Sequence, residues 1–203
     1  PAKPAAPAAQ PAAPAATPAP KATPAAAPAA PKAVRVKRLI FGSAGFAESN
    51  RHWTVARPEL LQFDPFLETL LDVDPKSGEF VARLADKWEF SPDAKDWTFF
   101  LKKGVPFHYG YGEFTARDMV HARSLVARED STSFDAAIWR SAQEVKAVDD
   151  YQVVFRMKNP VVTMPYLASR AVELRAVSKA QWDKEDLAGF DKRRAAPGVG
   201  RKS

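Results

Sequence analysis

The sequence predicts a mixed α and β fold of the α+β type, preceded by a disordered tail. Two patterns predict the folded part. Short segments alternate apolar and polar residues as half-buried strands do, and others space apolar residues as amphipathic helices do. A third observation separates the tail, because residues 1–33 are almost entirely Pro and Ala. Hydrophobic residues make up 46% of the chain and aromatic residues 11%, which is enough for a packed core.

The tail has no large apolar side chain to bury, so it cannot offset the entropy of ordering. Its frequent Pro residues favour an extended polyproline II spacer. We expect three parts: a disordered Pro/Ala-rich linker at 1–33, a folded domain at 34–190, and a basic, disordered or aberrant C-terminus at 191–203. The linker is either a tether or a solvated spacer, since composition specifies its stiffness and not its purpose.

The formal net charge of +6 first suggests a nucleic-acid or anionic partner. Most of this charge lies at the ends of the chain, because residues 39–191 hold 19 basic and 24 acidic residues. The folded part is therefore mildly acidic, and we expect no nucleic-acid partner. The chain has no Cys, which excludes disulfides and a cysteine nucleophile. No apolar run approaches the roughly 18 residues that a membrane-spanning helix needs.

The strands are expected mainly in hairpins. In residues 97–101, Trp97, Phe99 and Leu101 alternate with Thr98 and Phe100, which is the period of a strand buried on one face. Turn residues at 72–78, 93–96 and 149–150 predict three hairpins. The expected strands are 38–41, 79–81, 87–90, 97–101, 145–148, 151–157 and 171–177.

The helices are expected from their start signals. Thr115 and Asp118 have the spacing of an N-cap with an acidic residue at N3, so a helix should run from there to about Arg128. Pro58 is well placed to begin another helix, which Asp64-Pro65 interrupts or ends before Leu70. Further helices are expected at 161–169 and 178–187.

Catalytic motifs are missing from the sequence. It has no phosphate-binding glycine loop, no Gly-x-Ser-x-Gly elbow and no His-Glu-x-x-His helix. The histidines His52, His108 and His121 satisfy no structural zinc spacing, and ordinary surface or capping roles are expected for the last two. The sequence therefore predicts a protein that is not an enzyme and that has no metal or cofactor.

The candidate ligand-binding residues are Glu48, Asn50, Arg51 and Trp53. They lie in a polar segment, 48–53, that follows the first expected strand, where open sheets often contact a ligand. The segment offers a carboxylate, an amide, a guanidinium and an aromatic face within six residues. The alternative is a solvated connection in which Trp53 is tucked into the core.

Several stretches together resemble the family 5 extracellular solute-binding proteins, the peptide and dipeptide receptors of ABC importers. Residues 80–93 resemble the family's P-x-LA-x-SWE-x-S-x-D stretch, and residues 97–108 resemble its YTF-x-LR-x-GVKFHDG stretch. Residues 63–70, 113–120 and 148–155 are similar to further family segments in the same order. One departure lies at 109–112, where Tyr-Gly-Tyr-Gly replaces the family's Asp-Gly.

The resemblance implies the N-terminal part of the first lobe of a two-lobed periplasmic-binding-protein-like fold. It implies a periplasmic or cell-surface receptor that captures a peptide or similar small solute for ABC transporter permease subunits. A membrane tether upstream of the chain would suit the linker. The family continues for several hundred residues, whereas residues 195–203 begin its next motif and lose it. We therefore expect a truncated chain that binds its solute poorly when alone.

Two other functions remain open on the sequence. One is a tethered cell-envelope interaction protein that binds no small solute and uses the spacer to present its surface. The other is a nonfunctional gene fragment.

Overall fold

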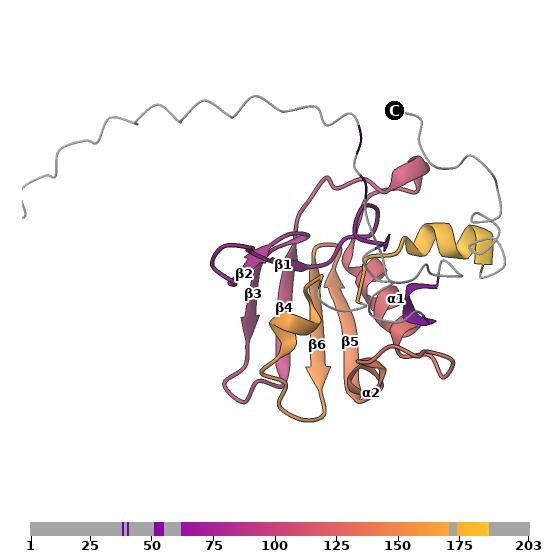
Figure 1. The fold of residues 1–203 in the computed structure, drawn as a ribbon. Coiled ribbons are helices and arrows are strands. Elements are labelled where there is room, and N and C mark those ends of the chain that lie inside the picture. Colours follow the sequence, from indigo (N-terminus) through magenta and orange to yellow (C-terminus); the bar gives the residue numbers. More distant parts are fainter. Residues whose placement is uncertain (1–37, 39, 41–50, 55–61, 171–173, 187–203) are drawn as a thin grey trace, which may run out of the picture. The chain divides into compact units, whose positions relative to one another are not determined.

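The computed structural model describes residues 38, 40, 51–54, 62–170 and 174–186. The expected linker at 1–33 and the expected basic C-terminus at 191–203 lie outside these residues. The described elements are shown in Figure 1 and follow in chain order: η1 (His52–Thr54), β1 (Leu71–Val73), β2 (Phe80–Ala82), β3 (Ala85–Phe90), β4 (Asp96–Leu101), η3 (His108–Gly110), α1 (Ala116–Val126), α2 (Ala136–Arg140), β5 (Ala142–Asp149), β6 (Gln152–Met157) and α3 (Met164–Leu167). Residues 179–186 are also helical.

A four-stranded antiparallel sheet with the strand order β3-β4-β6-β5 forms the body of the described chain. Its central strands pair with Trp97 opposite Phe155 and Phe99 opposite Val153. These four side chains point to one face and are buried. The alternation predicted for β4 is therefore confirmed, and it arises because successive residues of a strand face opposite sides.

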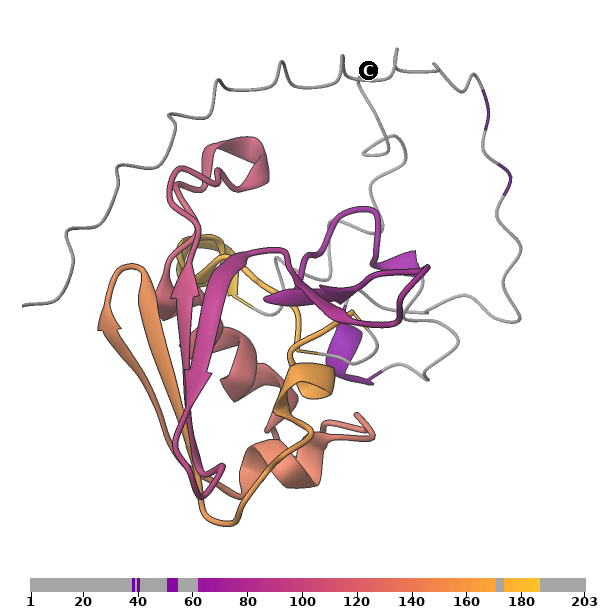
Figure 2. The same cartoon turned by 90° about the vertical axis from the view of Figure 1, so that its left-hand side faces the viewer.

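Helix α1 lies against the apolar face of the sheet, as Figure 2 shows. Its inner face carries Met119, Ala122 and Val126, all fully buried. The expected capping box is present, because the Asp118 carboxylate accepts hydrogen bonds from Thr115 N at 2.8 Å and from Thr115 Oγ1 at 2.9 Å. The helix ends at Val126, two residues before the expected end.

The opposite face of the sheet carries charged side chains. Arg156 lies between Asp96 and Glu144 in the ladder and forms ion pairs with both, at 3.1 and 3.3 Å. Lys87 covers the Phe100 ring, with its Nζ 4.0 Å from the ring centroid. One face is thus apolar and the other polar, as is common in antiparallel sheets.

The three predicted hairpins are confirmed, with small shifts at their ends. Asp74 closes the β1–β2 turn by accepting hydrogen bonds from the backbone N–H groups of Lys76 and Ser77. The β3–β4 turn holds Ala94 at φ 54°, and the buried Trp97 indole donates to the Ala94 carbonyl at 3.1 Å. The β5–β6 turn falls at residues 150–151, so Tyr151 is a turn residue and not the first residue of the strand.

Four expectations differ from the structure. Residues 62–70 form a turn and an extended stretch instead of a helix, because Asp64-Pro65 falls within the turn. The helix expected at 161–169 is limited to α3. Residues 174–178 form no strand, although Ala176 N donates to the Glu68 carbonyl at 2.7 Å. Of the strand expected at 38–41, only Arg38 and Ile40 are described, and neither lies in a strand.

Candidate functional site

The predicted binding segment is only partly described. Glu48 and Asn50 lie outside the described residues, whereas Arg51 and Trp53 lie at the start of the chain's first described turn. Thr54 closes this turn, because its N–H and its hydroxyl both donate to the Arg51 carbonyl, at 2.9 and 3.0 Å. Arg51 is half-buried and Trp53 is fully buried.

Trp53 is fixed by contacts with two distant segments. Its ring meets that of Trp182, in the helical run 179–186, edge-on at a centroid distance of 5.9 Å. Its carbonyl accepts hydrogen bonds from Thr132 N at 3.0 Å, Ser133 N at 3.2 Å and Ser131 Oγ at 3.0 Å. The ring therefore belongs to the core, which was the alternative considered for this residue. Contact between Trp53 and a solute stays a prediction.

His52 is a buried histidine beside this tryptophan. Its ring lies edge-on to those of Trp53, at 5.2 Å, and Phe63, at 6.2 Å. Neither ring nitrogen has a hydrogen-bond partner within the described part of the chain. Burial, together with the nearby positive charge of Arg175 and the imidazole of His121, lowers the pKa of His52 to about 3. The imidazole is therefore neutral at physiological pH.

His121 lies on the buried side of α1, next to Trp182 at a ring distance of 5.0 Å. The surface or capping role expected for this residue is wrong, because the α1 face that it shares with Ala122 and Leu125 packs inward. Burial and the charge of Lys179 lower the pKa of His121, while Asp183 and Asp118 act in the opposite direction. His108, by contrast, is exposed as expected.

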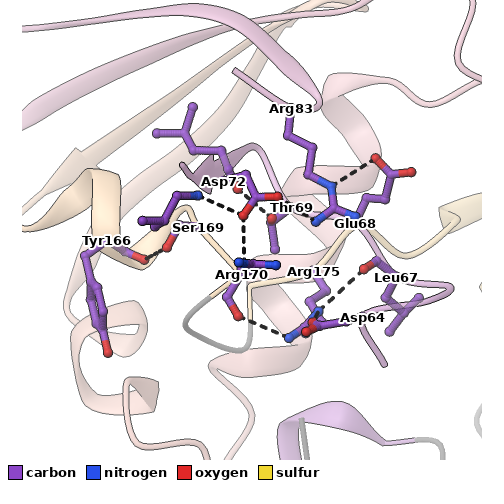
Figure 3. Close-up of polar contacts among 12 residues, drawn as sticks. Asp64, Leu67, Glu68, Thr69, Asp72, Arg83, Tyr166, Ser169, Arg170 and Arg175 are labelled. Carbon is purple, nitrogen blue, oxygen red and sulfur yellow. Dashed lines mark hydrogen bonds and ion pairs between the residues drawn. The ribbon is translucent and has the colours of Figure 1, made fainter. Parts of the chain in front are cut away.

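A charged cluster joins segments that are far apart in the sequence, as Figure 3 shows. It consists of Asp64, Glu68, Asp72, Arg83, Arg170 and Arg175. Asp72, in β1, forms ion pairs with Arg170 at 2.8 Å and with Arg83 at 3.4 Å. Arg83 also pairs with Glu68 at 3.3 Å. Acidic and basic groups therefore alternate from Glu68 to Arg170, and each charge lies next to one of opposite sign.

Arg175 is the most deeply buried member of this cluster, with 1% of its side chain exposed. It forms an ion pair with Asp64 at 2.7 Å and also donates to the carbonyls of Leu67 at 3.5 Å and Arg170 at 3.3 Å. Its neighbours Leu174 and Ala176 are buried as well, so the backbone carries the guanidinium into the interior. A buried guanidinium is tolerated only when paired in this way.

The charged cluster is suited to holding segments together and not to chemistry. Its carboxylates are engaged by guanidinium groups. Within the described ranges, no group of three or more His, Cys, Asp or Glu side chains is arranged to hold a metal ion. Sequence reasoning missed the cluster, although an arginine within the apolar run at 174–178 was a signal for a buried ion pair.

Comparison with known proteins establishes the family. The family model for "Bacterial extracellular solute-binding proteins, family 5 Middle" matches residues 79–200, which is more than half of the chain. The chain belongs to this family. Members of the family are extracytoplasmic solute-binding proteins and not enzymes, which confirms the predicted class and location.

Two curated relatives have similar sequences. The dipeptide-binding protein of Escherichia coli is 26% identical over 168 residues, which cover 74% of this chain and 31% of the relative. Di/tripeptide-binding protein 2 of Pseudomonas aeruginosa is 27% identical over 134 residues, which cover 58% of this chain and 25% of the relative. The chain thus spans between a quarter and a third of the curated relatives that it matches.

Solved structures support the same fold. OppA of Haemophilus influenzae, in complex with RPPGFSPFR, is similar with a TM-score of 0.58 at 25% identity, over 71% of this chain and 31% of that protein. A dipeptide binding protein from a Pseudoalteromonas species, in complex with Met-Leu, has a TM-score of 0.57 at 25% identity, over 66% and 30%. The predicted α+β class and its likeness to periplasmic binding proteins are therefore confirmed.

No helix among the described residues is both long enough and apolar enough to cross a membrane.

Proposed function

We propose that the chain forms part of the substrate-binding component of an ABC importer and that this component captures a peptide-like solute outside the cytoplasm. The family match over residues 79–200 is the observation that carries the proposal. The two curated relatives support the solute class, because both are named for binding dipeptides or tripeptides. The permease subunits of the importer are the proposed partners.

In this proposal, the solute is enclosed between two lobes that close on each other. The described residues contribute to the first lobe, and Glu48, Asn50, Arg51 and Trp53 are proposed to contact the solute. The contacts of Trp53 with Trp182 and with residues 131–133 support a fixed position for Trp53 before the solute arrives. Preorganisation of this kind reduces the entropic cost of binding.

The solute class is tested by isolating the protein from its own host with an antibody raised against residues 62–186. Bound solutes are released with acid and identified by mass spectrometry. The expected result is peptides of two or more residues, retained at near one equivalent per protein. Retention of a sugar, a metal chelate or nothing at all would contradict the proposal. The last result would favour an interaction protein without small-solute binding, or a nonfunctional product.

The proposed contacts are tested in the same host protein. Trp53 is fully buried, so its replacement by Ala would also destabilise the fold. Trp53→Phe and Arg51→Ala are milder changes that should weaken peptide affinity while leaving the circular dichroism spectrum intact. His108→Gln, at an exposed position outside the segment, is the matched control. Unchanged affinity in both variants would remove these residues from the site.

A further inference from the structure

A hairpin projects from the end of the sheet at residues 104–114, and Figure 1 shows it with η3 at its tip. Its two arms are joined by a hydrogen bond from Phe107 N to the Gly112 carbonyl at 2.8 Å. The hairpin carries the Tyr-Gly-Tyr-Gly segment, 109–112, at which the sequence departs from the family pattern. The proposed function gives this departure no role.

Tyr111, within this segment, contacts the helical run 179–186, which lies beside the hairpin in Figures 1 and 2. Its hydroxyl donates to the carboxylate of Glu185, 74 positions further along the chain. The Nζ of Lys184 lies 5.7 Å from the centroid of the Tyr111 ring. The hairpin is therefore attached to the C-terminal end of the described helical run.

The other end of this helical run is attached to α1. The Lys179 N–H donates to Asp118 Oδ1 at 2.7 Å, while the second oxygen of the same carboxylate, Oδ2, closes the capping box of α1. A helical run of about two turns is too short to be stable by itself. The contacts at its two ends therefore help to hold the run in place.

Trp182 lies between these two attachments and packs against the proposed solute segment. Its ring is half-buried and lies 5.9 Å from the ring of Trp53 and 5.0 Å from that of His121. The orientation of the helical run determines where the Trp182 ring lies, and Trp53 packs against that ring. A displacement of the run at its Glu185 end would therefore move Trp182 relative to Trp53.

We infer that Tyr111 and Glu185 are positioning residues for solute binding. Their contact holds the helical run against the hairpin, the run holds Trp182, and Trp182 holds Trp53. The inference rests on the proposed function, because Trp53 is a solute contact only in that proposal. Loss of the Tyr111–Glu185 contact leaves Trp53 less well ordered before the solute arrives, which raises the entropic cost of binding.

The first test measures the affinity of the full protein from its host for a dipeptide by calorimetry. Tyr111→Phe removes the hydroxyl and keeps the ring, and should weaken the affinity by about threefold to tenfold. Glu185→Gln keeps an acceptor oxygen for the hydroxyl and should retain most of the affinity. Tyr151→Phe is the matched control, because it removes a hydroxyl that donates to Glu113 in the same hairpin, at 3.0 Å. This control should leave the affinity unchanged.

A spectroscopic measurement follows the two tryptophans directly. The full protein is labelled with fluorotryptophan, and the fluorine resonances of Trp53 and Trp182 are assigned by replacing each residue with Phe. Tyr111→Phe should shift or broaden both resonances, whereas Tyr151→Phe should leave both as they are. A role of Tyr111 in stability alone would lower the urea midpoint without changing these resonances in the folded protein.

The inference is overturned if Tyr111→Phe leaves both resonances unchanged, or if it changes them while the peptide affinity stays that of the unaltered protein. It is also overturned if Tyr151→Phe weakens the affinity as much as Tyr111→Phe does. If the unaltered protein binds no peptide, the proposed function fails and the role in solute binding fails with it. That result is distinct from the others, in which the unaltered protein binds peptide normally.

Discussion

The sheet and the charged cluster are stabilised by different forces. The sheet is held by apolar side chains that alternate along neighbouring strands, with Phe99 and Phe155 in edge-on contact at 5.7 Å. The charged cluster is held by ion pairs between segments far apart in the chain, such as Asp64 and Arg175, 111 positions apart. The sheet should therefore depend on packing volume, and the charged cluster on charge pairing.

The largest expected effect comes from a cavity in the sheet. Phe155→Ala removes a fully buried ring that also contacts Trp139, and should lower the free energy of unfolding by about 4 kcal/mol. Val154→Ala, on the other face of the same strand, is the matched control and should cost much less. Equilibrium urea denaturation measures both. Equal losses would show that β6 does not divide into a core face and a solvent face.

The next effect tests the charged cluster. Asp64→Asn leaves the buried Arg175 guanidinium without its carboxylate, and should lower the free energy of unfolding by about 3 kcal/mol. Glu89→Gln removes one partner of the exposed Lys87–Glu89 pair and should change stability within the error of the measurement. If the two substitutions lower the free energy of unfolding equally, burial of Arg175 does not determine how strongly its ion pair stabilises the fold.

Local sequence patterns predicted the strands and helices around the sheet, but they did not predict the charged cluster. The alternation in residues 97–101 and the pairing of Thr115 with Asp118 are encoded within a few residues, and both were predicted correctly. A helical face was also suited by the spacing of Phe63, Phe66, Leu67 and Leu70. The same spacing is compatible with the turn and the extended stretch that the chain forms there. The Asp64–Arg175 pair is set by tertiary structure, so no local pattern could identify the two partners.

The candidate site was predicted only in part for the same reason. Segment composition drew attention to residues 48–53, but it could not show whether Trp53 faces a solute or the core. The burial of His52 and its position near Arg175 depend on segments that come together only in the fold. The charged cluster itself was not predicted.

Acid should destabilise the fold through His52. The pKa of this residue is about 3 in the fold and near 6.5 in the unfolded chain, so the unfolded state binds more protons between these values. The contribution of neutral His52 to the free energy of unfolding is therefore fully present above pH 6.5. It falls as the pH decreases, by up to about 1.4 kcal/mol per pH unit. Lowering of the His121 pKa acts in the same direction.

Urea denaturation between pH 7.5 and 4.5 measures this slope. His52→Phe should make the slope shallower, while His108→Gln, at an exposed position, should leave it as in the natural chain. If the slope of His52→Phe equals that of the natural chain, the imidazole of His52 is not the group responsible.

The smallest expected effect is a gain in stability. Tyr109→Gly removes a Cβ atom from a left-handed conformation at an exposed tip and should raise the free energy of unfolding by up to about 1 kcal/mol. Ala94→Gly is the comparison, because Ala94 has a similar φ of 54° but a buried methyl group. The gain in the free energy of unfolding from Ala94→Gly should be smaller, because the packing of the Ala94 methyl group is lost. A loss of stability in Tyr109→Gly would show that the ring contributes to the fold.

Calorimetric titration with dipeptides shows whether these residues form part of a two-lobed peptide receptor. We expect micromolar or tighter binding by the protein isolated from its host, and much weaker binding by the purified 203-residue chain. Micromolar binding by the 203-residue chain alone would contradict the need for a second lobe. Absence of peptide binding by the host protein would contradict the proposed function itself.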